Sequence, residues 1–572
     1  MTREPPADRR AGRKTATYGR VKSEPRAPAS AGRGARLRQR NPLRITAARF
    51  ERPDNSARRG SAPAGRPDRR LRVARDGPLA LPPRTLKPGA RSRSRFCDVR
   101  LALALRAPRS LALAVLFNVL ALVARGGPPE ALQATLKTEL GKLDAGARVG
   151  CLVADAESGA LWFASLPDEP LKPASVLKLF VSSAVLDQLG PDFAYRTRAC
   201  LAGDELWIVG AGDPSIGDER LAQRDGLDPS QLLNGYAALL AQRGVRSISK
   251  IVIDDDVFER EGRHPDWPDD QYAEWYQAPV GGVTLNDNCL DATFTAAGGV
   301  VRLSLRPDLP AGFYRNELKA AETHQPQVAR AIDSDIFVFS GPAARDDRFD
   351  PISVYRPSAF FAAAAQRALE KRGVQVGAVA RRSLSEEALQ GATLLHTHET
   401  PLRDVLWRCN NHSQNLFAEC LLKTLEAYRA DGARSGTPGS WQGAARLLRA
   451  RLAQMGVNCD SAVFRDGSGL SHDNRVTARQ VTDLLRVMRK HRHAAAFLES
   501  MSVSGEDGSL RTRYASEKLK GRLTGKTGTI SGVRNLAGYL RRSDGVTLVF
   551  AILANGVTAT DFNQRVCELL AD

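Results

Sequence analysis

The positive charge of this 572-residue chain is confined to its first hundred residues, which limits where a folded core can form. That segment holds 28 of the 83 Lys and Arg residues but only 8 of the 63 Asp and Glu residues, so it carries the whole net charge of +20. It is dominated by Arg, Pro, Ala, Gly and Ser, and we predict that residues 1–100 are disordered and basic. The rest of the chain is charge-balanced, so its surface gives no reason to expect a nucleic-acid partner.

An apolar run, LALAVLFNVLALVA, follows at residues 111–124 and is preceded by three arginines. Fourteen residues is short for a membrane-spanning helix, which needs about 20. The run matches the hydrophobic region of a secretory signal, with Ala124-Arg125-Gly126 as a cleavage site. We predict a signal peptide over 101–127 and an exported protein, periplasmic or at the outer face of the cytoplasmic membrane, with at most peripheral membrane contact. The alternative is a buried core helix.

The signal begins about a hundred residues after Met1, whereas secretory signals stand at the start of a protein. No further Met occurs before Met455. We therefore expect translation to start near residue 99, at Val99, in which case the basic segment is not translated.

The eight cysteines are scattered, and none forms a Cys-x-x-Cys pair. This spacing argues against a zinc site or a thioredoxin-like redox pair. Export would permit disulfides, although the sequence does not assign partners.

From about residue 129 the apolar periodicity is typical of a globular protein. Residues 195–395 are rich in strands and loops, the next stretch is helical, and the end of the chain is a sheet. The predicted helices cover 132–143, 176–189, 360–372, 415–429, 442–455, 478–490 and 561–570. The predicted strands cover 149–155, 160–164, 251–254, 300–305, 523–529, 535–541 and 546–554.

A Ser-x-x-Lys pair, Ser175 and Lys178, stands at the start of a predicted buried helix that ends at Gly190. Side chains three residues apart lie on one helical face. A lysine in an apolar helix has a lowered pKa and can take the proton of a serine hydroxyl, which makes the serine a nucleophile. Taken alone the pair is weak evidence, because a capping serine with a solvated lysine gives the same pattern.

Two further patterns follow in order. Ser413-Gln414-Asn415 begins a predicted helix, where a capping serine is the alternative reading. Lys526-Thr527-Gly528, followed by Thr529, lies on a predicted strand, where an exposed edge is the alternative. A lysine beside a glycine on a strand can present a cation, a hydroxyl and open backbone to a carboxylate.

Ser-x-x-Lys, Ser-x-Asn and Lys-Thr-Gly in this order are the signatures of serine β-lactamases and penicillin-binding proteins. The spacing of 238 positions from Ser175 to Ser413 leaves room for inserted domains. Residues 130–570 resemble the class-C low-molecular-mass penicillin-binding proteins, the D-alanyl-D-alanine carboxypeptidase/endopeptidase family (penicillin-binding protein 4 type). The strings that carry this narrower resemblance are Gly212–Ser215, His264–Pro268, Asp466–Ser471 and Gly505–Leu510.

The resemblance implies an α+β fold: a serine β-lactamase/DD-peptidase-like domain, in which helices flank an antiparallel sheet, with strand-rich domains inserted between the first and second motifs. We expect the catalytic domain at 128–195 and 396–572 and the insert at 196–395. The implied enzyme is a serine-type D-Ala-D-Ala carboxypeptidase/endopeptidase that acts on peptidoglycan stem peptides and is inhibited by β-lactam antibiotics. It implies neither a metal nor an organic cofactor, and it leaves the oligomeric state open.

The resemblance also implies a role for each matching residue. Ser175 is acylated, with Lys178 as the base. Ser413 relays a proton to the leaving amine, and Asn415 holds Lys178 and the substrate amide. Lys526 and Thr527 bind the terminal carboxylate beside Gly528. The backbone N–H groups of Ser175 and Thr529 form the oxyanion hole, worth about 3–4 kcal/mol per donor.

Three alternatives stand beside this interpretation. A β-lactamase would need a dedicated base for fast deacylation, and the long insert speaks against it. A non-catalytic wall-binding protein would not need all three motifs intact. A nucleic-acid binder would depend on the basic N-terminal segment alone.

Overall fold

A computed structural model describes residues 130–143, 146–259, 262–558 and 561–572. The predicted disordered segment, residues 1–100, and the predicted signal peptide, residues 101–127, lie outside these ranges. Within them, no helix is long and apolar enough to cross a membrane.

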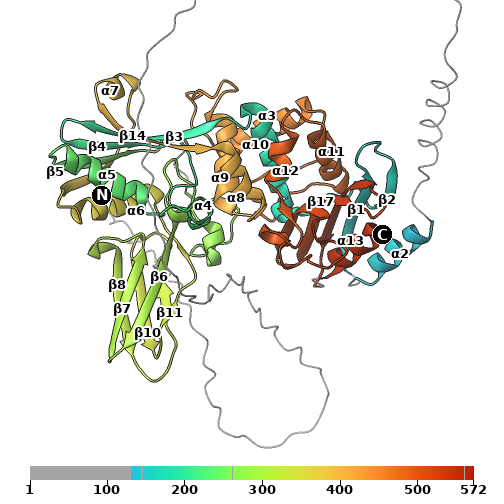
Figure 1. Cartoon of the computed structure of the whole chain (residues 1–572), viewed down its shortest axis with the longest axis horizontal. Helices are drawn as coiled ribbons and strands as arrows, with labels where there is room; N and C mark the ends of the chain where they lie inside the picture. The colour runs from blue at the N-terminus through green and yellow to red at the C-terminus, as the bar shows by residue number, and fades with distance from the viewer. Residues whose placement is uncertain (1–129, 144–145, 260–261, 559–560) are drawn as a thin grey trace, which may run out of the picture. The chain divides into compact units, whose positions relative to one another are not determined.

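The two ends of the described chain meet in one antiparallel sheet of six strands, ordered β15-β16-β17-β18-β1-β2. Strand β1 pairs along its whole length with β18, so a strand near the start of the described chain lies beside one near its end (Figure 1). The strands are β15 (Ser502–Val503), β16 (Leu523–Ile530), β17 (Val533–Arg541), β18 (Thr547–Asn555), β1 (Arg148–Asp155) and β2 (Leu161–Ser165). The strands that the alternating and apolar runs predict here are all present, within two residues at each end.

The central strand β18 is apolar almost throughout because both of its faces are buried. Side chains at 548, 550, 552 and 554 face one core, and those at 549, 551 and 553 face another. The first core is closed by helices α2 (Glu130–Gly141) and α13 (Phe562–Ala571). The second core contains the residues around Ser175, so the sheet supports that segment from behind.

Helices cover the second face of the sheet. The predicted helix after Ser175 begins as a 3-10 turn, η1 (Ala174–Leu177), and continues as α3 (Lys178–Leu189), which ends at Gly190. The other helices on this face are α8 (Leu402–Asn410), α9 (Asn415–Ala427), α10 (Trp441–Gln454), α11 (Ala478–Arg489) and α12 (Ala494–Glu499). Helix α8 is not predicted by the sequence, whereas α9, α10 and α11 are.

Between the first two motifs the chain forms a five-stranded sheet, ordered β13-β5-β4-β3-β14. The β4–β5 and β5–β13 pairs are parallel. The strands are β3 (Ala194–Ala202), β4 (Glu205–Val209), β5 (Ser247–Asp254), β13 (Gln375–Arg381) and β14 (Thr393–Pro401). Helices α5 (Gln231–Gln242) and α6 (Pro357–Glu370) pack on it; α6 is predicted by the sequence and α5 is not.

Two smaller sheets and short helices complete this stretch. One sheet joins β6 (Cys289–Ala297), β7 (Val300–Arg306), β11 (Asp347–Arg348) and β12 (Ile352–Ser353); the other joins β8 (Tyr314–Ala320), β9 (Gln327–Ala329) and β10 (Phe337–Ala343). The short helices of this stretch are α4 (Glu219–Asp225), α7 (Glu386–Gln390), η2 (Asp269–Gln271), η3 (Trp275–Gln277), η4 (Asn286–Asn288) and η5 (Ala311–Phe313). A further 3-10 turn, η6 (Gly508–Leu510), lies between β15 and β16.

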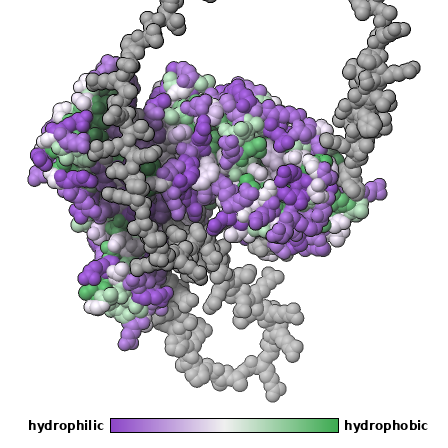
Figure 2. All heavy atoms as spheres, viewed as in Figure 1, coloured by the Kyte–Doolittle hydropathy of each residue, from purple (hydrophilic) through white to green (hydrophobic). Residues whose placement is uncertain are grey.

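The surface and the thiols have simple distributions. On the face seen in Figure 2, hydrophobic residues are scattered among hydrophilic ones. The seven described cysteines are all buried and free, at positions 151, 200, 289, 409, 420, 459 and 567. Burial raises the pKa of several of these thiols, including that of Cys409 to about 11, which keeps them protonated.

Candidate active site

Ser175 lies in a turn that is held on two sides. The buried amide of Asn535 on β17 donates to the carbonyl oxygens of Lys172 and Pro173, at 2.9 and 2.8 Å. Ala174 has a φ of +44°, a conformation that needs such support. The turn leaves the Ser175 side chain partly exposed, while the next residues of η1 are buried. The hydroxyl is therefore accessible to a substrate on a fixed backbone.

Lys178 is fully buried, and its ammonium nitrogen contacts three oxygen atoms. Nζ lies 2.8 Å from Ser175 Oγ, 2.8 Å from Asn415 Oδ1 and 2.9 Å from the carbonyl oxygen of Ser468. Burial lowers the pKa of Lys178 to about 8, against the opposing effect of nearby acidic groups. A neutral Lys178 amine at this distance can accept the Ser175 proton.

The second motif lies at the start of α9, opposite the first. Asn415 accepts from Lys178 through Oδ1 and donates through Nδ2 to the carbonyl oxygen of Tyr276, at 2.9 Å. Ser413 precedes the helix with a φ of +61°, and its hydroxyl lies 2.8 Å from Lys526 Nζ. The serine is thus turned toward the third motif rather than used as a helix cap.

The third motif lies on β16, as predicted. Lys526 is fully buried, and Nζ donates to Ser413 Oγ and, at 2.9 Å, to the carbonyl oxygen of Thr527. Burial, and in second place the Lys178 charge, hold the pKa of Lys526 well below its usual range. A Cβ on Gly528 would lie 2.6 Å from the Pro173 carbonyl oxygen, so β16 runs directly against the Ser175 turn. Thr529, one residue on, is exposed.

The eight predicted site residues therefore form one arrangement built from η1, α3, α9 and β16. Ser175, Lys178 and Asn415 are joined by hydrogen bonds, and so are Ser413 and Lys526. Two buried lysines flank two partly exposed serine hydroxyls, an arrangement suited to proton transfer to and from a reacting acyl group. No group of side chains with the composition of a metal site occurs among the described residues.

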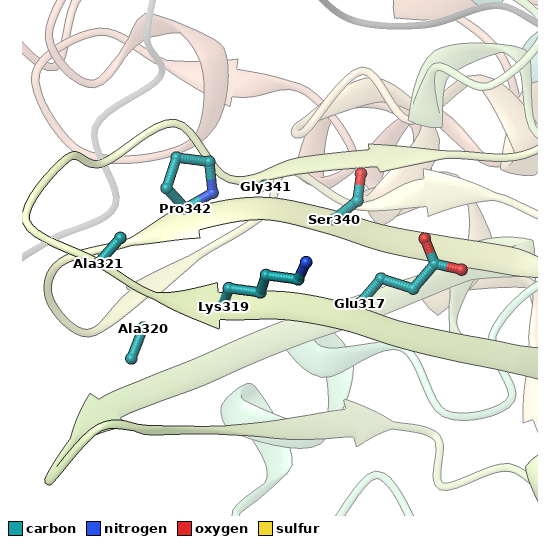
Figure 3. A pocket seen from close by; sticks show the side chains of 7 residues that line it. All are labelled: Glu317, Lys319, Ala320, Ala321, Ser340, Gly341 and Pro342. Carbon is teal, nitrogen blue, oxygen red and sulfur yellow. The ribbon is translucent and has the colours of Figure 1, made fainter.

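A shallow pocket elsewhere contains none of these residues. It has a volume of about 740 Å³ and is lined mainly by residues of the paired strands β8 and β10. Glu317 and Lys319 project from one strand and Ser340 from its neighbour (Figure 3). The chemistry of the three motifs is thus separate from it.

Comparison with known proteins is decisive. The model of the D-Ala-D-Ala carboxypeptidase 3 (S13) family matches residues 132–569. The chain belongs to this family. The predicted family, the α+β fold class and the enzyme class, a serine-type D-Ala-D-Ala carboxypeptidase, are confirmed.

Individual proteins are also similar to this chain over most of its length. The D-alanyl-D-alanine carboxypeptidase of Actinomadura sp. (strain R39) is 29% identical over 448 residues, which is 72% of this chain and 78% of that protein. The D-alanyl-D-alanine carboxypeptidase DacB of Haemophilus influenzae is 24% identical over 408 residues, 68% of this chain and 82% of that protein. The crystal structure of penicillin binding protein 4 from Haemophilus influenzae has a TM-score of 0.63 at 22% identity and covers 76% of this chain and 99% of its own, which shows a shared fold.

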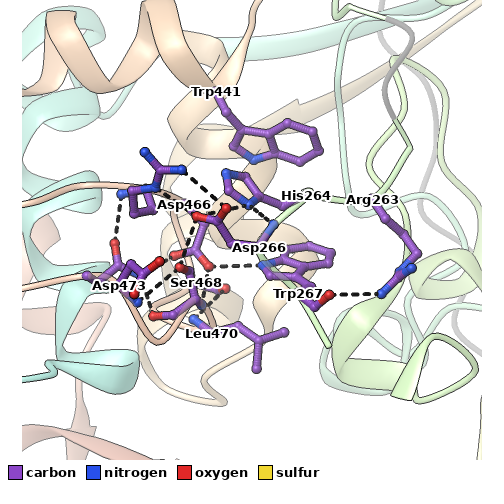
Figure 4. Close-up of polar contacts among 12 residues, drawn as sticks. Arg263, His264, Asp266, Trp267, Trp441, Asp466, Ser468, Leu470 and Asp473 are labelled. Carbon is purple, nitrogen blue, oxygen red and sulfur yellow. Dashed lines mark hydrogen bonds and ion pairs between the residues drawn. The ribbon is translucent and has the colours of Figure 1, made fainter. Parts of the chain in front are cut away.

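Sequence reasoning missed the backbone atoms that complete this S13 site. The carbonyl oxygen of Ser468 binds Lys178, and that of Tyr276 binds Asn415. Ser468 lies in the 466–471 string, which carries the resemblance but had no predicted role. Figure 4 shows Asp466 of that string, with Trp267 donating to its carboxylate at 3.0 Å. A carbonyl oxygen that binds a side chain leaves no pattern of residue types. Only the family resemblance of the 466–471 string could have pointed to this contact.

Proposed function

We propose that this chain is a serine D-alanyl-D-alanine carboxypeptidase/endopeptidase of peptidoglycan stem peptides that reacts through a Ser175 acyl-enzyme. The contact between Lys178 Nζ and Ser175 Oγ carries the proposal, because it joins a buried lysine of lowered pKa to a partly exposed hydroxyl. In the acylation step Lys178 takes the Ser175 proton while Oγ bonds to the penultimate D-Ala carbonyl carbon. The peptide C–N bond then breaks, and the terminal D-Ala leaves as an amine that has received a proton. Water then hydrolyses the ester and regenerates Ser175.

The remaining residues have supporting roles in this proposal. Ser413 passes a proton to the leaving amine, and its bond to Lys526 supports that path. Asn415 holds Lys178 and the substrate amide. Lys526 and Thr527 bind the terminal carboxylate, whose negative charge favours the protonated form of the buried lysine. The N–H groups of Ser175 and Thr529 stabilise the oxyanion.

Inhibition by β-lactams and the location of the protein follow from the same chemistry. β-Lactam antibiotics acylate Ser175 in place of the stem peptide, because their ring amide presents a reactive carbonyl next to a carboxylate. The protein acts outside the cytoplasm, in the periplasm or at the outer face of the cytoplasmic membrane, where stem peptides are found.

Labelling with a fluorescent penicillin tests this function. We expect covalent labelling of the purified chain and its loss in Ser175→Ala. Ser183→Ala is the matched control, because Ser183 lies on α3 and bonds only to the Leu179 carbonyl oxygen, at 2.7 Å. The unlabelled enzyme should also release D-Ala from a peptide that ends in D-Ala-D-Ala.

Two results would contradict the proposal. An unlabelled wild-type chain would favour a non-catalytic wall-binding protein. Rapid turnover of the penicillin, without release of D-Ala from the peptide, would favour a β-lactamase.

A further inference from the structure

The loop 466–471 contacts Lys178 and the turn that carries Ser175. The Ser468 carbonyl oxygen lies 2.9 Å from Lys178 Nζ. Gly469, with a φ of +83°, packs so closely on the Ser175 turn that a Cβ would lie 1.9 Å from the Ala174 carbonyl oxygen. The position of this loop therefore affects where the lysine and the nucleophile lie relative to each other.

The loop backbone is held by two buried carboxylates. Asp466 accepts the N–H of Gly469 at 2.9 Å and that of Ser471 at 2.6 Å. Glu419 accepts the N–H of Gly467 at 2.9 Å and that of Ser468 at 2.7 Å. Both peptide units that flank Ser468 are thus anchored, and its carbonyl oxygen is directed at Lys178.

Glu419 differs from Asp466 because it lies outside the loop. It is on α9, one turn after Asn415, so one helix carries both an acceptor for Lys178 and the anchor of a second acceptor. The Trp441 indole N–H, at 2.8 Å, completes its hydrogen bonds. None of its contacts reaches Ser175, and its side chain is fully buried.

We propose that Glu419 is a positioning residue for acylation, one that holds the Gly467 and Ser468 amides so that the Ser468 carbonyl oxygen keeps Lys178 Nζ on Ser175. The inference rests on the proposed function, since it needs Lys178 to be the base. In this inference a buried carboxylate acts together with the three motifs, and the 466–471 string supplies the carbonyl oxygen that positions Lys178.

The charge of Glu419 also reaches Lys178. Desolvation, and in second place Asp466, raise the pKa of Glu419, while the ionised carboxylate raises the pKa of Lys178. Cys409 of α8, Asp466 of the loop and Lys526 of β16 face Lys178 as well. On its own helix, Glu419 is also near Cys420 and Lys423. All of these groups remain in a variant that changes only Glu419.

The test compares Glu419→Gln with wild type in the rate constant of penicillin acylation, measured from pH 6 to pH 9.5. We expect a fall of about ten- to a hundredfold at pH 8, because a small displacement of a reacting group has an effect of that size. Loss of the negative charge should also move the rising limb of the profile to lower pH.

Glu426→Gln is the matched control. Glu426 lies on the same helix and accepts the Ser440 N–H at 2.8 Å, so it too anchors a neighbouring segment through its carboxylate. In Glu426→Gln the acylation rate constant should rise over the same pH range as in wild type, and it should be at least about half of the wild-type value. A purely structural role for Glu419 would lower the melting temperature without moving the limb.

Glu419→Asp provides a second measurement should Glu419→Gln fail to fold. It keeps the charge and shortens the side chain, so we expect a slower reaction with the limb unmoved. If Glu419→Gln folds, the inference is overturned when its pH profile is unmoved and Glu419→Asp reacts at the wild-type rate. If Glu419→Gln does not fold, a wild-type rate in Glu419→Asp alone overturns it. The proposed function itself would fail in another way, by labelling that persists in Ser175→Ala.

Discussion

At the scale of residues, the site depends on how a charge is accommodated without water. Lys178 has no solvent contact, yet three oxygen atoms surround its nitrogen, so the ammonium form is satisfied by hydrogen bonds. Burial still favours the neutral form and brings the pKa to about 8. A base in this range can be neutral for a useful fraction of the time at physiological pH and still accept a proton readily.

The pH dependence of acylation follows from this pKa. Because the neutral amine is the reactive form and burial lowers its pKa, the acylation rate constant should rise with pH and level off, with a midpoint near pH 8. At two units below the midpoint it should be about a hundredfold lower.

The measurement is the rate constant of penicillin labelling from pH 6 to pH 9.5, with circular dichroism confirming that the fold is unchanged. Lys178→Met should lower the plateau by about 10²- to 10⁴-fold, the usual contribution of a general base. A flat profile in the wild type would mean that Lys178 is not the base.

At the scale of elements, most of the sheet and helices could be predicted because their signals are local. The apolar run of β18 and the break after α3 at Gly190 lie within the segments that they define. Helices α5 and α8 were missed. Helix α8 is short and has a mixed apolar and charged sequence, and α5 stands in a stretch that was predicted to be rich in strands and loops. The 3-10 turn at Ser175 depends on Asn535, which is distant in sequence, so no local pattern could predict it.

Within the site, too, some atoms were predictable from the local sequence and others were not. The side chains of the three motifs were predicted, because the chemistry requires particular residue types at fixed spacing. The carbonyl oxygens of Ser468 and Tyr276 were not, because any residue supplies a carbonyl and only the fold places it.

The close contact between the 466–471 loop and η1 predicts that Gly469 does not tolerate a larger side chain. Gly469→Ala combines an unfavourable φ of +83° with a Cβ placed 1.9 Å from the Ala174 carbonyl oxygen. Gly436 has the same φ but no atom within 4 Å of its Cβ position, so Gly436→Ala tests the backbone effect alone. We expect a loss of about 1–2 kcal/mol in Gly436→Ala, with normal labelling.

In Gly469→Ala the turn that carries Ser175 must shift, so labelling should fall by about a hundredfold or more. Thermal unfolding and the labelling rate are measured on both variants. Equal effects in the two would show that the loop does not support the nucleophile.

At the scale of the whole molecule, the stretch between the first two motifs is bonded to the second motif. Asp218 binds Arg408 of α8 at 2.6 Å, and Asp287 of η4 binds Arg408 at 3.2 Å. The Gln414 amide, between Ser413 and Asn415, donates to Asp287 at 2.7 Å. The stretch between the first two motifs therefore contacts the residues that lead into and form the second motif.

The pKa values of the two buried carboxyls are shifted in opposite directions, which makes Asp287 testable. Desolvation, and in second place Asp218, raise the pKa of Asp287 well above its usual range, while the Arg408 charge holds that of Asp218 low. Asp287→Asn resembles the protonated acid and should be close to wild type in stability and labelling. Asp287→Ala leaves Arg408 and Gln414 short of an acceptor and should cost about 1–3 kcal/mol, with several-fold slower acylation.

Denaturant unfolding and penicillin labelling on both variants distinguish these expectations. A wild-type rate in Asp287→Ala, despite lost stability, would mean that the second motif keeps its geometry without the Asp287 contact.

The buried thiols can show, by their reactivity, which parts of the structure have opened. Each layer contains at least one: Cys151 and Cys567 under the six-stranded sheet, Cys409 and Cys420 among the helices, and Cys200 on the five-stranded sheet. A bulky thiol reagent can modify such a group only after its layer has separated from its neighbours. The order in which these cysteines become modified under mild denaturant would give, by mass spectrometry and without any engineered probe, the sequence in which the layers come apart.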